Sequence, residues 1–560
     1  MPSGAQLIVQ SLEEQNIKVI FGIPGGAIMI FYDKLRDSNI RHILMRHEQG
    51  AAHAADGYAR ASGKVGVCSA TSGPGATNLV TGIATAYMDS SPIIAITGQV
   101  PTSAIGSDAF QEVDIVGIVN PIVKYAFQLR SAKDIPVVFR KAFFIASNGR
   151  PGPVLIDVPK DVQQEIVDEI DIPKEIAISG RSVVSPDPDP ALVKKAAEML
   201  LNAERPLIIC GGGIIQANAS QDLLSIVELL QIPVVTTLMG KGAIPENHPL
   251  CIGMIGMHGR VEANKAVSEA DVILAIGTRF SDRSTGLFSE FAKQAKVIHV
   301  DIDESEINKN IKVDIAINAD AKKFLKMLHT VLLSLPSKRD RTRWLEKLRE
   351  LKSQYAHIYE RDGNFLKPWK ILKIMREELP PDSIITTGVG QNQMWAALHF
   401  PVYEPRTFIT SGGLGTMGFG FPAALGAKAA KPDKHVVCID GDGSFLMTSQ
   451  NLATAVSEDL PVIVVVFDNR SLGMVRQWQV MFLEKRCTEV DLGPSPDIEK
   501  LAKAFGAEGY SVGSYQEFRE AFRRSLRNEI CTIIDVPIHP DEKVLPMVPP
   551  GKPLTEVILE

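Results

Sequence analysis

The stretch Gly441-Asp442-Gly443-Ser444-Phe445, together with Asn469, which follows Asp442 by 27 residues, decides the fold of this chain. The apolar runs 436–439 and 461–467 lead into these two sites, and each is typical of a buried strand. If a helix joins them as parallel strands, Asp442 and Asn469 meet at the carboxyl edge of one sheet, where α/β proteins bind ligands. A carboxylate, an amide oxygen and a backbone carbonyl suit Mg²⁺, with positions left for phosphate oxygens. Taken alone, the two turns could also be unrelated strand ends.

Composition is typical of a soluble globular protein with several domains. The 560 residues are too many for one core. The net charge of −6 and the lack of a basic block argue against nucleic acid as a partner. No apolar stretch is long enough to span a bilayer, and no signal or transit peptide is recognisable. The six cysteines are scattered, which indicates buried thiols, so we expect a cytoplasmic protein without a membrane partner.

Apolar runs alternate with amphipathic stretches along almost the whole chain, as in parallel sheets covered by helices. We expect an α/β fold of three doubly wound parallel-sheet domains and a C-terminal tail. Residues 185–190 indicate a linker, and the charged stretch 336–369 is expected to be a solvated helix and a connector. The predicted units are an N-terminal domain at 1–165, a central domain at 190–335, a third domain at 365–535 and a proline-rich tail at 538–560.

Glu48 is a candidate catalytic residue. It follows a predicted strand at 42–45, and small residues come after it at 50–52. By itself such a glutamate is more often a carboxylate that interacts with the positive end of a helix dipole. His47 and His53 are six residues apart, so they do not match a zinc-binding helix, in which the spacing is four.

The joint order of several motifs is far more specific than any one of them. With Glu48 and the 441–469 pattern, they resemble the thiamine-diphosphate-dependent enzymes, and they are most similar to the catalytic subunits of the acetolactate synthase family. The resemblance covers essentially the whole chain. It implies a pyrimidine-binding domain, a central FAD-binding domain and a diphosphate-binding domain, in that order. The motifs lie at residues 21–26, 70–78, 108–112, 150–161, 256–259, 280–283, 411–420 and 473–478.

The resemblance implies how thiamine diphosphate and Mg²⁺ are bound. Glu48 would share a proton with the pyrimidine ring nitrogen, which requires a carboxyl group in an apolar pocket. Mg²⁺ would bind the Asp442 and Asn469 side chains and the Ser471 backbone oxygen. The Gly415 carbonyl would face the 4′-amino group. The other residues expected at the cofactor are Gly390, Gln391, Asn392, Met417, Gly441, Gly443 and Ser444. Of these, Met417 would support the bent cofactor, although a methionine after a glycine loop can also be a core residue.

The resemblance also implies a substrate site. Phe110, Gln111 and Lys160 match residues that line the substrate channel, although Lys160 could be only a solvated cation. The Arg283 guanidinium would bind the carboxylate of the second 2-ketoacid in a bidentate manner. Trp478 would form a wall that favours 2-ketobutyrate over pyruvate, although an isolated tryptophan is more often a core residue.

A structural FAD is implied for the central domain. Glycines after its strands let backbone amides approach a pyrophosphate, but none of them forms the GxGxxG pattern, so the residues alone give only a weak dinucleotide signal. The residues expected at the flavin are Arg150, Gly211, Gly212, Gly213, Thr237, Leu238, Met257, His258, Asp301 and Asp320.

The implied reaction decarboxylates pyruvate and joins the remaining two-carbon unit to pyruvate or 2-ketobutyrate, the first common step of branched-chain amino-acid biosynthesis. Homodimers or homotetramers are expected, with Glu48 acting across a two-fold interface, and a small regulatory subunit is a possible partner. Three alternatives remain. A pyruvate oxidase would use redox-active FAD, a simple decarboxylase would release acetaldehyde, and a non-catalytic protein would bind the cofactor without releasing CO₂.

Overall fold

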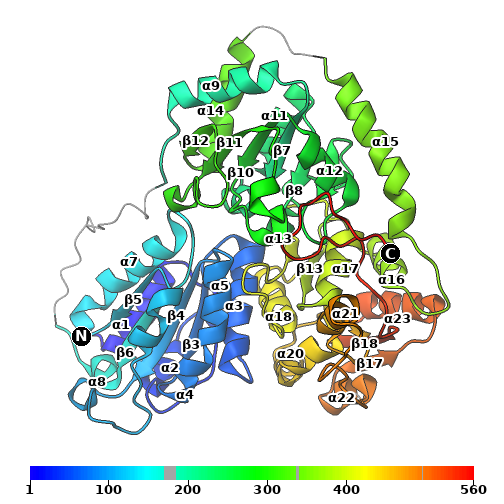
Figure 1. The fold of residues 1–560 in the computed structure, drawn as a ribbon. Coiled ribbons are helices and arrows are strands. Elements are labelled where there is room, and N and C mark those ends of the chain that lie inside the picture. Colours follow the sequence, from blue (N-terminus) through cyan, green and yellow to red (C-terminus); the bar gives the residue numbers. More distant parts are fainter. Residues whose placement is uncertain (169–184, 336–339, 495) are drawn as a thin grey trace.

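The structure is a computed structural model that describes residues 1–168, 185–335, 340–494 and 496–560. It contains three six-stranded sheets with flanking helices, and the strands of each sheet run parallel (Figure 1). The predicted α/β class with three parallel sheets is confirmed. Within these described ranges, no helix combines the length and apolarity that a membrane span requires.

The first sheet has the strand order β2-β1-β3-β4-β6-β5. β1, β3 and β4 are buried along their full length, as expected for central strands of a sheet covered on both faces. The strands are β1 (Val19–Gly22), β2 (Arg41–Leu44), β3 (Gly66–Ala70), β4 (Ile93–Gln99), β5 (Tyr125–Gln128) and β6 (Val154–Pro159). The helices are α1 (Gly4–Glu14), α2 (Met29–Leu35), α3 (Glu48–Ser62), α4 (Pro74–Asn78), α5 (Val80–Met88), α6 (Ile115–Val119), α7 (Ile135–Ser147) and α8 (Lys160–Gln164).

The middle sheet has the order β12-β11-β10-β7-β8-β9. Its first helix begins at Pro190 and is capped by the Asp189 side chain, so the predicted linker at 185–190 ends where a helix starts; part of the preceding boundary lies outside the described residues. The strands are β7 (Pro206–Cys210), β8 (Val234–Thr236), β9 (Cys251–Met254), β10 (Val272–Ile276), β11 (Lys296–Asp301) and β12 (Ile315–Asn318). The helices are α9 (Pro190–Asn202), α10 (Gly212–Gln216), α11 (Ser220–Leu230), α12 (Val261–Glu269), α13 (Asp282–Thr285) and α14 (Ala321–Ser334).

The third sheet has the order β14-β13-β15-β16-β18-β17. β15 and β16 pair in parallel, with Gly441 opposite Phe467, as the opening stretch predicts. The strands are β13 (Ile384–Thr387), β14 (Phe408–Ile409), β15 (Val436–Gly441), β16 (Ile463–Asp468), β17 (Glu508–Ser511) and β18 (Thr532–Pro537). The helices are α16 (Pro368–Glu378), α17 (Gln391–His399), α18 (Gly420–Ala430), α19 (Asp442–Leu446), α20 (Leu452–Ser457), α21 (Gly473–Phe482), α22 (Ile498–Ala504) and α23 (Tyr515–Arg527).

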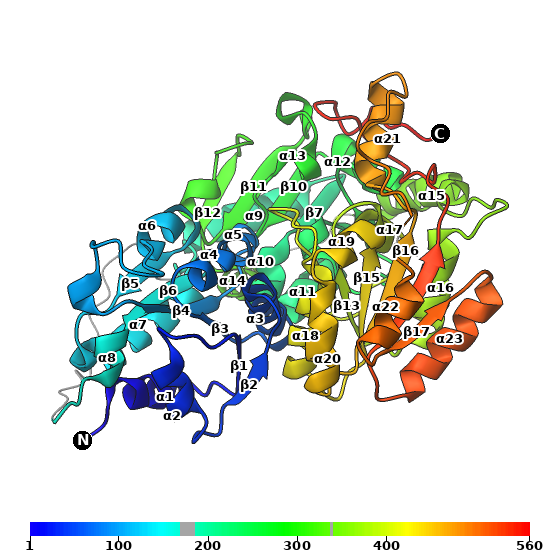
Figure 2. The same ribbon diagram turned by 90° about the horizontal axis from the view of Figure 1, so that it is seen from below.

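Helices α3 and α18 join the first and third sheets, and they lie side by side in both ribbon views (Figures 1 and 2). A Cβ atom on Gly57 would overlap the backbone of Ala423, and one on Gly426 would overlap the carbonyl of Ala54. Only glycine therefore allows the two helices to approach this closely. One buried apolar cluster extends across both units as a result.

The connector between the middle and third sheets corrects one expectation. Helix α15 (Thr342–Tyr359) forms in the charged stretch, but it is not a fully solvated helix. Trp344, Leu348 and Leu351 are buried against the middle unit, and the Trp344 indole donates a hydrogen bond to the Pro206 carbonyl at 3.1 Å. The sequence interpretation missed this apolar stripe at helical spacing, because charged residues on the outer face dominate the composition of the stretch.

The C-terminal tail returns from the third unit to the middle one, next to α13 (Figure 1). The Val548 N–H donates to the Met257 carbonyl at 2.7 Å, and the Leu287 N–H donates to the Lys552 carbonyl at 3.0 Å. Val544 exchanges two hydrogen bonds with the Gln477 side chain in α21. The tail therefore ties α21 to the middle unit.

Candidate active site

Asp442 and Asn469 lie at the carboxyl ends of the neighbouring strands β15 and β16. Both side chains are buried, as is Ser471. The Asp442 Oδ2 atom is buried and meets no hydrogen-bond donor among the described residues. Burial, followed by the charge of Asp468, raises the pKa of Asp442 to about 7. An uncompensated carboxylate in the interior is costly, so this position fits a cation.

Hydrogen bonds orient the Asn469 side chain at the same edge of the sheet. The Asn469 amide donates to Gln391 Oε1 at 3.0 Å, and its Oδ1 atom accepts from the Ser471 N–H at 3.1 Å. The described residues contain no group of three or more His, Cys, Asp or Glu side chains that could hold a metal ion. With one carboxylate and one amide, Asp442 and Asn469 suit Mg²⁺ only if a ligand such as a diphosphate supplies further oxygens.

Hydrogen bonds connect the 441–445 turn and the end of β15 before it with neighbouring loops and helices. The Ser444 hydroxyl accepts from the Gly418 N–H at 3.0 Å, which fixes the loop that carries Met417. Met417 is half-buried and not a core residue, so its side chain is available to a ligand. The Asn392 amide donates to the Ile439 carbonyl in β15, and it packs beside Gly441.

Glu48 is the first residue of α3, and only 9% of its surface is exposed. The Asn78 amide donates to Glu48 Oε2 at 2.9 Å. The other oxygen, Oε1, lies toward Gly75. The hydrogen bond from Asn78 orients the carboxyl group. The arrangement leaves one oxygen of Glu48 for a ligand.

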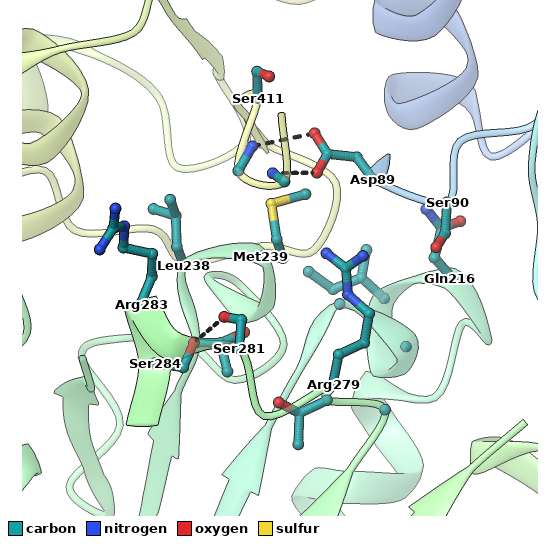
Figure 3. Close-up of a pocket in the computed structure, with 18 of the residues that line it drawn as sticks. Asp89, Ser90, Gln216, Leu238, Met239, Arg279, Ser281, Arg283, Ser284 and Ser411 are labelled. Atoms are coloured by element: carbon teal, nitrogen blue, oxygen red, sulfur yellow. Dashed lines mark hydrogen bonds between the residues drawn. The ribbon is translucent and has the colours of Figure 1, made fainter. Parts of the chain in front are cut away.

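A cavity of about 630 Å³ lies where the middle unit meets the loop 410–415 of the third (Figure 3). All the residues predicted at a flavin line it except Gly211, which packs against Gly277 behind the wall. Arg150 donates to Glu306 at 2.7 Å and to Asp303 at 3.2 Å. Burial raises the pKa of Asp301 to about 6.

Arg283 and Trp478 line one part of this cavity, together with Gly390 and Gly415. The Arg283 guanidinium lies 5.8 Å from the Trp478 ring centroid, a cation–π distance. Arg283 forms an exposed ion pair with Asp282 at 3.3 Å, and its side chain is 56% exposed, so the guanidinium remains accessible to an anion. Trp478 is half-buried at the wall of the cavity and not enclosed in a core.

The four other predicted catalytic residues do not line the cavity. Glu48, Phe110, Gln111 and Lys160 all belong to the first unit, outside the set of lining residues. Phe110 is 88% exposed, which is unusual for a side chain of its size. Lys160 is half-buried at the start of α8. The chain therefore carries its predicted catalytic residues in two separate groups.

Several residues of the cavity were missed by the sequence interpretation. Arg279 points into the cavity (Figure 3), and burial lowers the pKa of its guanidinium. It follows the strand β10 directly after Gly277-Thr278, so the strand-end reasoning applied to Asp442 could have found it. Asp89 and Arg60 were also missed, because nothing in their local sequence marks them as cavity residues.

Family profiles match three parts of the chain. The profile for the N-terminal thiamine-pyrophosphate-binding domain of thiamine pyrophosphate enzymes matches residues 2–118, the central-domain profile matches 193–328, and the profile for the C-terminal thiamine-pyrophosphate-binding domain matches 388–536.

Curated relatives match over nearly their full length. A protein of Methanocaldococcus jannaschii named "Probable acetolactate synthase large subunit" is 52% identical over 99% of this chain and 95% of its own. The acetolactate synthase large subunit of Corynebacterium glutamicum is 46% identical, with 99% and 90% covered. The acetolactate synthase isozyme 2 large subunit of Escherichia coli is 43% identical, with 99% of both chains covered.

Proposed function

Since the chain belongs to the acetolactate synthase large-subunit family of thiamine-diphosphate-dependent enzymes, we propose that it decarboxylates pyruvate and joins the two-carbon unit to a second 2-ketoacid. The products are 2-acetolactate, or 2-aceto-2-hydroxybutyrate when 2-ketobutyrate is the acceptor. Both lead to branched-chain amino acids. The observation that carries this assignment is the buried Asp442 carboxylate beside Asn469, whose Oδ2 atom meets no donor among the described residues and which fits a cation–diphosphate site.

Bound thiamine diphosphate supplies an electron sink on which a 2-ketoacid can lose CO₂. Asp442, Asn469 and the Ser471 carbonyl would hold the Mg²⁺ that binds its diphosphate. Glu48 would share a proton with the pyrimidine nitrogen through Oε1, the oxygen that does not accept the hydrogen bond from Asn78. The Gly415 carbonyl would accept a hydrogen bond from the amino group of the same ring, and the Met417 side chain would support the ring.

We further propose that the active site forms between two copies of the chain, in a homodimer or homotetramer. Support comes from the separation of the predicted catalytic residues, because Glu48, Phe110, Gln111 and Lys160 lie apart from the cavity that Arg283 and Trp478 line. A two-fold interface would bring the first group of one chain to the second group of another.

The 630 Å³ cavity is proposed to hold a structural FAD, for which Arg150 and Arg279 supply positive charge near the pyrophosphate. We also propose that the chain divides into domains at 1–165, 190–335 and 365–535, with the tail at 538–560 covering the site. A cytoplasmic location and a small regulatory subunit, which the "large subunit" names of the relatives suggest, complete the proposal.

The direct test incubates the purified protein with pyruvate, thiamine diphosphate, Mg²⁺ and FAD, and measures acetolactate, CO₂ and acetaldehyde together. One CO₂ for each acetolactate is the expected result. CO₂ with acetaldehyde would identify a decarboxylase, and electron transfer to oxygen or a quinone would identify an oxidase. Cofactor binding without CO₂ would identify a non-catalytic protein.

Replacing Arg283 with Gln is expected to uncouple the two halves of the reaction. Loss of the guanidinium group should raise the KM for the acceptor 2-ketoacid by about 10- to 100-fold, because charge-assisted hydrogen bonds to the carboxylate of the acceptor disappear. Release of CO₂ should then exceed formation of acetolactate, as measured by both products in one assay. Arg283→Lys is the matched control. It retains the positive charge without the planar, bidentate N–H donors and should show a smaller effect. Equal loss of both products would contradict this role.

A further inference from the structure

The loop 410–415 is held by a buried carboxylate from another unit of the chain. Asp89 lies directly after α5 in the first unit. Its Oδ1 atom accepts from the Gly413 N–H at 2.7 Å, and its Oδ2 atom accepts from the Gly412 N–H at 3.1 Å. Figure 3 shows this carboxylate against the turn of the loop, at the wall of the cavity. Asp89 thus accepts hydrogen bonds from two successive backbone amides, and such bonds to a carboxylate are stronger than bonds between neutral groups.

A buried arginine completes this contact. Arg60 in α3 donates to Asp89 Oδ2 at 3.0 Å and to the Thr410 carbonyl at 2.7 Å. It also donates to both oxygens of Asp56, one turn earlier in the same helix, at 2.7 and 2.9 Å. The three charged side chains are at most 8% exposed. Burying these three charged side chains costs desolvation energy that their ion pairs do not always repay. Stability alone is therefore a poor explanation for the cluster.

The loop has close contacts on its other sides as well. A Cβ atom on Gly413 would lie 2.8 Å from Asp89 Oδ1 and from the Met88 carbonyl, so only glycine allows this approach. A Cβ atom on Gly412 would overlap the sulfur of Met239 in the middle unit. The loop is therefore placed by first-unit and middle-unit side chains, although it belongs to the third unit.

We propose that Asp89 is a positioning residue that, held by Arg60, sets the place of Gly412 and Gly413 and thereby of Gly415. The inference rests on the proposed function, in which the Gly415 carbonyl orients the thiamine ring. The same turn forms part of the wall of the proposed flavin cavity. Asp89 thus connects the geometry of the two cofactor sites, while touching neither reacting atom.

The test compares Asp89→Asn with Asp56→Asn. Each variant leaves Arg60 with one carboxylate partner, but only Asp89 contacts the loop, so the two should lose thermal stability to a similar extent. Asp89→Asn should lower kcat roughly tenfold, with a smaller change in the KM for pyruvate, whereas Asp56→Asn should stay within about twofold of the wild type. Hydrogen exchange of the segment 408–418 and the Kd for FAD, followed by flavin fluorescence, report on the loop without the reaction. Both should change in Asp89→Asn alone.

Gly413→Ala provides a second route if Asp89→Asn does not fold, because it disturbs the same contact while the ion pair stays intact. It should reproduce the loss of kcat and the faster exchange. Equal kcat and equal exchange in Asp89→Asn and Asp56→Asn, or a Gly413→Ala variant that behaves like the wild type, would overturn the proposal. If the wild type forms no acetolactate, the proposed function fails, and exchange and FAD affinity still decide whether Asp89 holds the loop.

Discussion

Replacing Glu48 with Gln is expected to lower the rate of acetolactate formation by about 10²- to 10⁴-fold, the usual loss when a positioned acid–base group is removed. The side chains have the same shape. The Gln carbonyl can still accept the hydrogen bond from Asn78, so the amide nitrogen then faces the ligand, to which it can donate a hydrogen bond but cannot transfer a proton. Acetolactate formation under saturating cofactor measures the effect, and thermal stability should be close to that of the wild type.

Asn78→Ala is a milder variant that tests the hydrogen bond to Glu48. It removes one neutral hydrogen bond and leaves the carboxyl group, so a loss of roughly tenfold or less is expected. A Glu48→Gln enzyme with more than a tenth of the wild-type rate would remove Glu48 from the mechanism. A loss in Asn78→Ala as large as that in Glu48→Gln would indicate that the two side chains act as one unit.

Replacing Asp442 with Asn is expected to weaken Mg²⁺-dependent binding of thiamine diphosphate by at least about 100-fold, since loss of a metal ligand should cost at least as much as loss of the groups that orient one. The apoprotein should not lose stability, because Asp442 Oδ2 is buried without a donor, and burial and the charge of Asp468 both disfavour the ionised carboxylate. Calorimetric titration with thiamine diphosphate and a melting curve without it measure the two effects. Chelation of Mg²⁺ from the wild type should reproduce the binding defect. If Asp442→Asn binds thiamine diphosphate as tightly as the wild type, or if the chelator does not weaken binding by the wild type, Asp442 is not a metal ligand for this cofactor.

The two variants together test the proposed interface. If Glu48 of one chain serves the Asp442 site of another, a dimer of one Glu48→Gln chain and one Asp442→Asn chain contains one intact site and one doubly altered site. Such dimers, selected through a different affinity tag on each chain, should recover about half of the wild-type activity. They should stay inactive if each chain builds its own site.

Local chemistry explains why so much of this site could be read from the sequence. The strands β15 and β16 are buried on both faces, so they appear as continuous apolar runs, and the residues that follow them must lie at one edge of the sheet. Asp442 and Asn469 could therefore be placed together without coordinates. The helix in the stretch 336–369 was also expected, but its buried face was not, because charged residues dominate its composition.

The sequence by itself determined the alternation of strands and helices, the turn that carries Asp442 and the family to which the motifs point, because these depend on neighbouring residues and on periodicity. Only the tertiary structure decided that Asp89 accepts a hydrogen bond from Gly413, 324 residues away. It also decided that Arg279 lines the same cavity as Arg150 and Arg283, and that Glu48 does not. Each of these depends on how separate sheets pack against one another, and a single isolated carboxylate or guanidinium carries no local signal of its distant partner.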